Sequence, residues 1–293
     1  MIRTISLMLL SGSLFAAERA ADFPAALDKA KAGGQDIAVL YHGSDWCAPG
    51  EKVAAMWRRD DFEKGMGKDV VLVAIDRKER PDEAEAATAK RNEACPVGVR
   101  SYPGIALFDA EGRLVAKREG MSEIESMGAP GQALLRAVEV RRKRDALWQR
   151  AAKESGPAAA RLLGKGLDMM NLGLGPKDVY KPVLERIRKE DPEDRSGYVA
   201  RYTFPGMKLV ESAMKLAGEQ KFEDADKEIA AWLSKRSLLP DQRQQALSAR
   251  FALYNRWDAR KGDVKSVLRE LEKADPESEL GKGAAEYLKM LGS

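Results

Sequence analysis

The sequence is poor in the side chains that bind metals or build disulfide frameworks. Its 293 residues include two cysteines, Cys47 and Cys95, and one histidine, His42. These three match no zinc-finger spacing and are too few for a structural zinc site without help from carboxylates. The glycine-rich stretches at 164–166 and 173–177 also lack the Gly-Lys-Ser/Thr end of a phosphate-binding loop. We therefore expect no metal and no other cofactor.

Charge of one sign is not in excess, and long hydrophobic runs are absent after the first residues. Lys and Arg number 50 against 46 Asp and Glu, a formal net charge of +4. Nucleic-acid-binding proteins concentrate basic residues on one face, so this mixed distribution predicts no nucleic-acid partner. The densest basic run is Arg141-Arg142-Lys143-Arg144, which we expect to form the solvated face of a helix. No later stretch reaches the length of a membrane span.

The first residues have the form of a secretory signal peptide. Arg3 supplies a positive start, an apolar run begins at Ile5, and the run ends at the small residues Ala16 and Ala17. This pattern predicts a signal peptide over 1–21, with cleavage near 16–17. The alternative is a buried N-terminal helix, which seldom combines a basic start with a small-residue end. We therefore expect an exported protein, periplasmic or secreted, whose cysteines meet an oxidising environment.

Residues 22–150 alternate between helical and strand patterns. Apolar residues at helical spacing predict helices at 22–34 and 47–62. A polar, alanine-rich stretch predicts a helix at 83–94, and another is expected from about 130. Continuous apolar runs predict buried strands at 37–41, 70–75, 104–109 and 114–116. A βαβ start followed by a closing antiparallel hairpin predicts an α/β domain in which helices flank a mixed sheet.

Residues 151–293 contain no further strand-like run. Apolar residues recur at helical spacing in several stretches, among them 207–217, 222–232 and 264–271. Proline after aspartate, at Asp191-Pro192 and Asp275-Pro276, ends helical stretches. Short breaks between amphipathic helices predict antiparallel α-hairpins. We therefore expect an all-α second domain, which resembles a tetratricopeptide-type array although no clear repeat period is found.

Two motifs in the first domain resemble the signatures of the thioredoxin superfamily. The first motif is similar to the active-site segment Trp-Cys-x-Pro-Cys and consists of Gly43-Ser44-Asp45-Trp46-Cys47-Ala48-Pro49. Its Gly-Ser-Asp-Trp-Cys sequence is similar to that of exported bacterial thioredoxin-like proteins. Gly98-Val99-Arg100-Ser101-Tyr102-Pro103 is similar to the second signature, Gly-(Val/Ile)-Arg-x-x-Pro. The resemblance covers about 22–150 and implies a cis proline that faces the cysteine beside a groove for an extended client chain. The groove residues that it implies are Trp46, Ala48, Pro49, Gly50, Tyr102 and Pro103.

Cys47 is the candidate nucleophile. A cysteine just before a helix faces unpaired backbone N–H groups and the positive end of the helix dipole, and both favour the thiolate. Pro49 suits the first helical turn, which needs no N–H donor. In the family a second cysteine resolves the mixed disulfide, but Gly50 stands at that position here. Tyr41 stands where the family commonly has a buried acid, so a dithiol oxidoreductase cycle is not supported.

Three interpretations of Cys47 stay open. It acts as a monothiol in thiol–disulfide exchange with client proteins or a small thiol, or it remains in a non-catalytic binding or scaffold domain. In the third interpretation it is bonded to Cys95, which the resemblance places away from it, near the end of the third helix. His42 is a candidate modulator of the thiol, but the plainer interpretation, which we favour, is that it bonds a nearby backbone carbonyl. The expected partners are client proteins, bound at the surface of Cys47 and Pro103 or by the helical domain.

Overall fold

A computed structural model describes residues 16–170 and 177–292 of the chain, and most of the expected signal peptide, residues 1–15, lies outside the described residues. The chain divides into two compact units. Unit 1 comprises the residues up to Arg150 together with 165–182, and unit 2 comprises 151–164 and the residues from Val183 onward. The sequence predicted one boundary near residue 150 and did not predict that 165–182 would return to unit 1.

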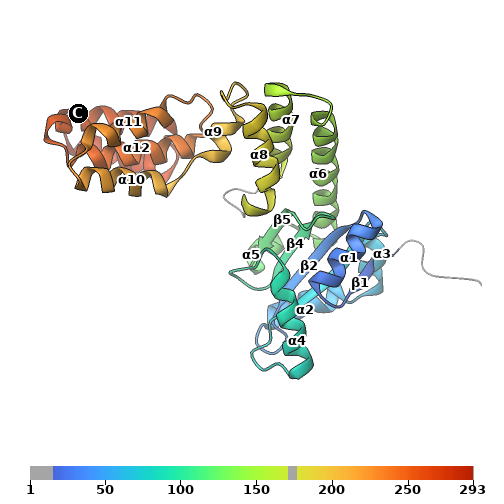
Figure 1. Ribbon diagram of the computed structural model, residues 1–293. Coiled ribbons are helices and arrows are strands. Elements are labelled where there is room, and N and C mark those ends of the chain that lie inside the picture. Colours follow the sequence, from blue (N-terminus) through green and yellow to red (C-terminus); the bar gives the residue numbers. More distant parts are fainter. Residues whose placement is uncertain (1–15, 171–176, 293) are drawn as a thin grey trace, which may run out of the picture. The chain divides into compact units, whose positions relative to one another are not determined.

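Unit 1 is built on a five-stranded mixed sheet with the order β1-β3-β2-β4-β5 (Figure 1). Its strands are β1 (Glu18–Ala20), β2 (Asp36–His42), β3 (Val70–Asp76), β4 (Gly104–Phe108) and β5 (Leu114–Glu119). β1 and β2 pair with β3 in parallel, whereas β4 pairs with β2, and β5 with β4, in antiparallel fashion. The four predicted strands are all present, because their continuous apolar runs supply buried strands. The short edge strand β1 was not predicted.

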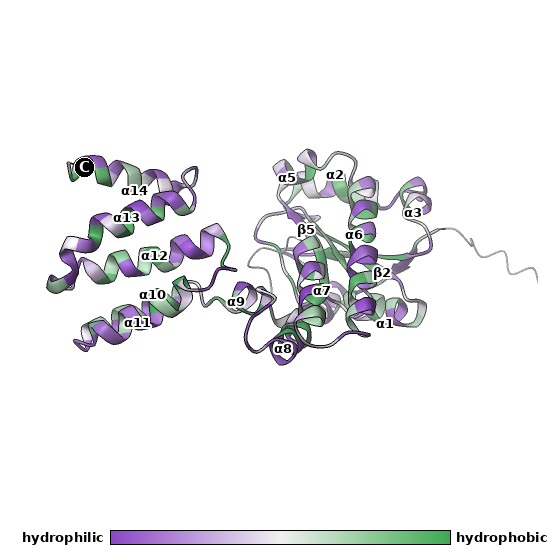
Figure 2. Cartoon of the chain, turned by 90° about the horizontal axis from the view of Figure 1, so that it is seen from above, coloured by the Kyte–Doolittle hydropathy of each residue, from purple (hydrophilic) through white to green (hydrophobic). Residues whose placement is uncertain are grey.

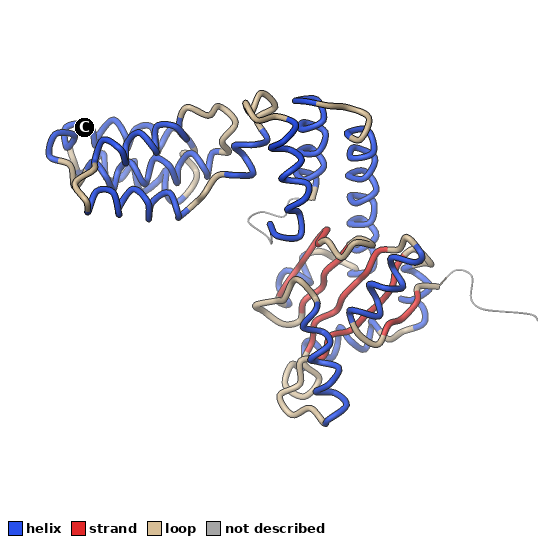
Figure 3. Tube along the Cα trace, viewed as in Figure 1, coloured by secondary structure: helices blue, strands red, loops and turns tan. Residues whose placement is uncertain are grey.

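Helices flank this sheet, and all strands of the described residues lie in unit 1 (Figure 3). Up to residue 151, the helices of this unit are α1 (Phe23–Gly33), α2 (Ala48–Trp57), α3 (Asp60–Met66), α4 (Glu83–Arg91), the 3-10 turn η1 (Asn92–Ala94), α5 (Met121–Ser126) and α6 (Pro130–Ala151). The predicted helix at 47–62 is two helices, because the backbone of Arg59 is extended between them. The expected α/β fold class is therefore confirmed.

Each face of the sheet has its own apolar core. On one face, Leu40 and Leu107 pack with Trp57 of α2. On the other face, Val39 packs with Phe23 of α1. Consecutive residues of a strand point to opposite faces, so a strand covered on both sides must be apolar at every position. This explains the unbroken apolar run of β2.

The basic run on α6 is only in part the solvated face that we predicted, because Arg142 and Lys143 are exposed whereas Arg144 is buried and Arg141 is half-buried. The side chain of Arg144 is 0% exposed, and its guanidinium donates to Asp109 and Asp145, each at 2.7 Å. Arg141 donates to both carboxylate oxygens of Asp36, at 2.9 Å each. Burial raises the pKa of Asp36, and the contact with Arg141 opposes that shift. These two arginines therefore fasten α6 to the sheet.

After α6 the described residues form helices and the loops between them, and no further strand. These helices are α7 (Gly156–Met169), η2 (Lys177–Tyr180), α8 (Lys181–Glu190), α9 (Tyr198–Thr203), α10 (Met207–Gly218), α11 (Phe222–Leu233), α12 (Pro240–Tyr254), η3 (Asp258–Asp263), α13 (Val264–Ala274) and α14 (Glu279–Met290). In unit 2, α10 to α14 lie side by side and share one apolar core (Figure 2). The all-α second region is confirmed, and its tetratricopeptide likeness stays a prediction.

The apolar faces predicted for unit 2 are largely those that the core uses. Ile229 of α11 and Leu268 of α13 are buried as expected. Met207 was expected to be apolar core, but it is 66% exposed because it is the first residue of α10. Within the described ranges, no helix is both long and apolar enough to cross a bilayer.

Candidate functional site

Cys47 stands at the start of α2, where the resemblance places it. It is the N-cap residue: its carbonyl accepts from the Glu51 N–H at 3.0 Å, and its own N–H donates to the Gly43 carbonyl at 2.8 Å. Its thiol makes no capping hydrogen bond, and Pro49 lies in the first turn, where no N–H donor is needed. The sulfur is therefore held at the N-terminal end of α2.

Gly50 lies against the sulfur. A Cβ atom built on Gly50 would be 3.0 Å from Cys47 Sγ and 3.2 Å from His42 Cβ. The position that corresponds to the second cysteine of the resembled motif therefore lies close to both Cys47 and His42. The site keeps the geometry of a dithiol pair but contains one sulfur.

An aromatic contact joins the two motifs. The rings of Trp46 and Tyr102 pack edge to face with their centroids 5.0 Å apart, and the Tyr102–Pro103 peptide bond is cis. The Trp46 indole N–H donates to the Arg77 carbonyl at 2.6 Å, which fixes the ring. The ring lies over Gly43, where a Cβ would come within 2.2 Å of it. The structure therefore brings the two segments together across the ends of β2 and β4.

Two carboxylates hold the loop that precedes Cys47. Asp76, the last residue of β3, accepts from the Ser44 backbone N–H at 2.9 Å and from its hydroxyl at 2.6 Å. Asp45 accepts from the backbone N–H groups of Glu79 and Arg80, at 3.1 and 2.9 Å. The loop that precedes Cys47 is therefore tied to the end of β3 and to the segment that follows it.

A surface hollow of about 570 Å³ opens beside Cys47. It is lined by Ser44, Asp45, Trp46, Cys47, Ala48, Glu51, Lys52 and Ala55. Cys47 is 7% exposed and Trp46 is 43% exposed, so a partner meets the tryptophan before it meets the sulfur. Of the predicted groove residues, Trp46 and Ala48 line this hollow, whereas Pro49, Gly50, Tyr102 and Pro103 do not.

His42 lacks the hydrogen bond that we expected. It is 4% exposed, and its Nδ1 has no hydrogen-bond partner. Nδ1 lies 3.7 Å from Glu51 Oε2, which is likewise buried without a partner, and 4.0 Å from Asp76 Oδ1. Burial lowers the pKa of His42, although the carboxylates of Asp76 and Glu51 oppose the shift. The neutral imidazole is therefore favoured at pH 7.

Tyr41 and Cys95 lie on the other face of β2 from His42. Consecutive strand residues point to opposite faces, and Tyr41 packs in the core against which Cys95 also lies. The Tyr41 hydroxyl donates to the Val97 carbonyl at 2.6 Å and lies 3.1 Å from Cys95 Sγ. Both cysteines are free, and burial raises the pKa of Cys95. The structure therefore shows no bond between Cys47 and Cys95.

Glu51 and Asp76 are the site residues that the sequence analysis missed. Glu51 follows Cys47 by four residues, a spacing that places both on one side of a helix, and this was the signal available. Asp76 pairs with His42 across β2 and β3, which follows only from the register of the strands. Among the residues that the structure describes, no group of three or more His, Cys, Asp or Glu side chains is arranged to hold a metal ion.

Comparisons with known proteins bear on unit 1. A family model described as a thioredoxin-like domain matches residues 23–129. Among solved structures, a DsbH oxidoreductase is similar at 18% sequence identity and a TM-score of 0.30, over 44% of this chain and 95% of its own. No curated protein matches the chain significantly. Residues 23–129 of this chain are a thioredoxin-like domain of the thioredoxin superfamily.

Proposed function

We propose that this chain is an exported thioredoxin-fold protein in which Cys47 acts as a monothiol nucleophile in thiol–disulfide exchange with client proteins. The observation that carries the proposal is the placement of Cys47 at the N-terminus of α2, in a surface hollow and next to the position of a missing second sulfur. The helix end favours the thiolate, and one sulfur is enough to attack a disulfide.

The chemistry of this step balances without a redox cofactor. The Cys47 thiolate attacks one sulfur of a client disulfide, the client S–S bond breaks, and a mixed disulfide forms at Sγ. The other client sulfur leaves as a thiolate and takes up a proton. A second thiol, from the client or from a small molecule, then attacks the mixed disulfide and regenerates Cys47. The number of disulfides is unchanged, so the protein shuffles disulfides and does not consume them.

His42 and Glu51 supply the proton transfer in this scheme. Nδ1 of His42 and Oε2 of Glu51 are buried 3.7 Å apart with no hydrogen-bond partners, and a Cβ at residue 50 would lie 3.2 Å from His42 Cβ and 3.0 Å from Cys47 Sγ. Burial favours the neutral imidazole of His42, which has a free nitrogen to accept a proton. In this proposal it takes up the thiol proton, and Glu51 stabilises the imidazolium that results. The imidazolium then returns the proton to the departing client thiolate.

Replacement of His42 by asparagine should lower the rate of exchange mainly near neutral pH. We expect the second-order rate constant with oxidised glutathione to fall roughly tenfold or more at pH 7. The loss should shrink at about pH 9, where thiols ionise without a base. Tyr41→Phe, which changes the neighbouring residue on the other face of β2, should leave the rate unchanged. An equal loss at both pH values would show that His42 acts only through packing.

A second candidate function is binding without catalysis, by a thioredoxin-fold scaffold protein of the cell envelope. The low exposure of Cys47, 7%, and the glycine at position 50 favour it. In that case Trp46 and Tyr102 are contact residues for a partner, and the sulfur takes no part. Export rests on the basic and apolar pattern of the first residues, and the helical domain supplies a second surface for partners.

The two candidate functions differ in whether a mixed disulfide forms at Cys47. If Cys47 is a nucleophile, incubation of the full chain with oxidised glutathione gives a mixed disulfide on Cys47 that a reductant reverses. Intact-mass analysis should show one glutathione on the wild type and on Cys95→Ser, and none on Cys47→Ser. Cys95 should stay unmodified, because its side chain is partly buried and its sulfur is hydrogen-bonded to the Tyr41 hydroxyl. Absence of the adduct at Cys47 would leave the scaffold as the function.

A further inference from the structure

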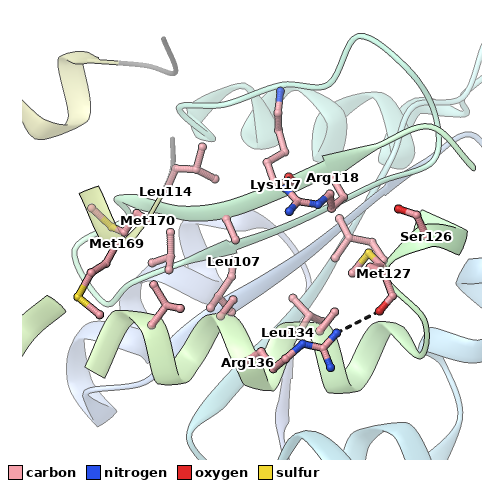
Figure 4. A pocket seen from close by; sticks show the side chains of 16 residues that line it. Leu107, Leu114, Lys117, Arg118, Ser126, Met127, Leu134, Arg136, Met169 and Met170 are labelled. Atoms are coloured by element: carbon pink, nitrogen blue, oxygen red, sulfur yellow. Dashed lines mark hydrogen bonds between the residues drawn. The ribbon is translucent and has the colours of Figure 1, made fainter. Parts of the chain in front are cut away.

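A cavity of about 590 Å³ lies in unit 1, away from Cys47 (Figure 4). It runs between the edge strand β5 and helix α6, with β4 behind it, and residues at the end of α7 line one end. Its volume falls in the range of about 300–1,000 Å³ that is usual for small-molecule sites. None of the residues that line the hollow beside Cys47 lines this cavity.

One end of the cavity is apolar. Met169 and Met170 lie at this end with Leu114 nearby, and Leu107 lies midway along the wall (Figure 4). Leu107 and Leu134 are buried side chains of the sheet and of α6. The sulfur of Met170 accepts from the Tyr180 hydroxyl at 3.2 Å, which fixes that side chain, whereas the unbranched side chain of Met169 is 37% exposed and can adapt to an apolar ligand. This end therefore suits an alkyl chain and offers it no charged partner.

The other end of the cavity is cationic. Arg118 and Arg136 lie toward it, with the hydroxyl of Ser126 nearby (Figure 4). Each guanidinium donates to a backbone carbonyl, Arg136 to Met127 at 3.0 Å and Arg118 to Lys117 at 2.8 Å. Neither forms an ion pair with any described residue, so both charges are unneutralised. Guanidinium groups bind carboxylates by paired, charge-assisted hydrogen bonds.

We propose that this cavity binds a linear alkyl carboxylate of the fatty-acid class. The tail lies toward Met169 and Met170, and the carboxylate meets Arg118 and Arg136. A wholly apolar ligand would leave the two guanidinium groups without an anion, whereas a short polar anion would leave the apolar end unfilled. The site is independent of Cys47, so its success or failure does not decide the thiol chemistry.

The test uses the full chain and dodecanoate, measured by displacement of the fluorescent probe dansyl-undecanoic acid. We expect saturable binding with one ligand per chain. The methyl ester of dodecanoate keeps the tail but has no charge, so it should bind about tenfold more weakly. The double substitution Arg118→Ala/Arg136→Ala should weaken the acid by about tenfold or more and abolish its advantage over the ester.

Two further variants test whether binding takes place in this cavity. Arg80→Ala/Arg150→Ala removes the same charge from exposed arginines elsewhere in unit 1 and should not change affinity. Ala133→Phe fills the cavity from the half-buried side of α6 and should abolish binding, with thermal melting used to show that the variant is folded. Absence of saturable binding by the wild type overturns the proposal. So does unchanged affinity in the Arg118/Arg136 variant or in folded Ala133→Phe.

Discussion

Substitution of Gly50 by cysteine is expected to convert the single-thiol site into one that forms a disulfide with Cys47. The Cβ that a side chain would add at residue 50 lies 3.0 Å from Cys47 Sγ and 3.4 Å from Cys47 Cβ. A disulfide of normal bond length places the Cβ of one cysteine about 3 Å from the sulfur of the other. The backbone of Gly50 is helical, so cysteine enters without strain from its backbone angles.

The new thiol should also change the reaction. A resolving sulfur in the same helical turn attacks the mixed disulfide at a high effective concentration, so clients are released without a second thiol. We expect reduction of a protein disulfide, followed with insulin and dithiothreitol, to rise roughly tenfold or more over the wild type. Gly50→Ser, which adds a side chain of similar size without sulfur, should give no gain. If both thiols of Gly50→Cys stay free under oxidised glutathione, the geometry proposed for the site is wrong.

Arg144→Ala is expected to destabilise unit 1 by up to about 3–5 kcal/mol, because it removes one of the two guanidinium groups that compensate a buried carboxylate. The Arg144 side chain is 0% exposed, and Asp109, whose side chain is 2% exposed, accepts from it at 2.7 Å. The guanidinium also lies 4.5 Å from the centre of the Trp148 ring. In the variant Arg113 still forms an ion pair with Asp109 at 2.7 Å, so part of the negative charge of that carboxylate remains compensated.

Native-state hydrogen exchange of the full chain measures this loss for unit 1 alone. Amides of β4 and β5 should lose protection in Arg144→Ala, whereas those of α12 in unit 2 should not change. Lys143→Ala alters the exposed neighbour in the same helix and should change stability by less than about 0.5 kcal/mol. Equal protection in the Arg144→Ala variant and the wild type would mean that the buried ion pair contributes nothing to stability.

The sequence was sufficient to predict those helices and strands that have a distinctive local pattern of residues. The strands at 37–41 and 70–75 are uninterrupted apolar runs, and only a strand buried on both faces needs such a run. The motif around Cys47 begins a helix because Pro49 and the turn at Gly43 to Asp45 favour that start. The cis bond before Pro103 was implied by the resemblance of its segment, and no periodicity of the sequence indicates it.

What the sequence could not show depends on contacts between distant residues. Arg144 looks like a solvated residue in a basic run, and only the position of Asp109 at the end of β4 makes it buried. His42 and Asp76 become neighbours through strand register. The edge strand β1 has three residues, too few for a pattern, and it pairs because β3 offers a free edge. The cavity beside β5 follows from helix placement, which has no local sequence signal.

The central claim is that the fold makes Cys47 a reactive nucleophile, and the most direct test is its rate of reaction with oxidised glutathione. The Cys95→Ser variant isolates Cys47, and the rate is measured at pH 7 in the native protein and in the same protein unfolded by denaturant. We predict that the native protein reacts roughly tenfold faster, because folding places the sulfur at the N-terminus of a helix beside His42. A native rate equal to or below the unfolded rate would contradict the claim and leave unit 1 as a binding domain.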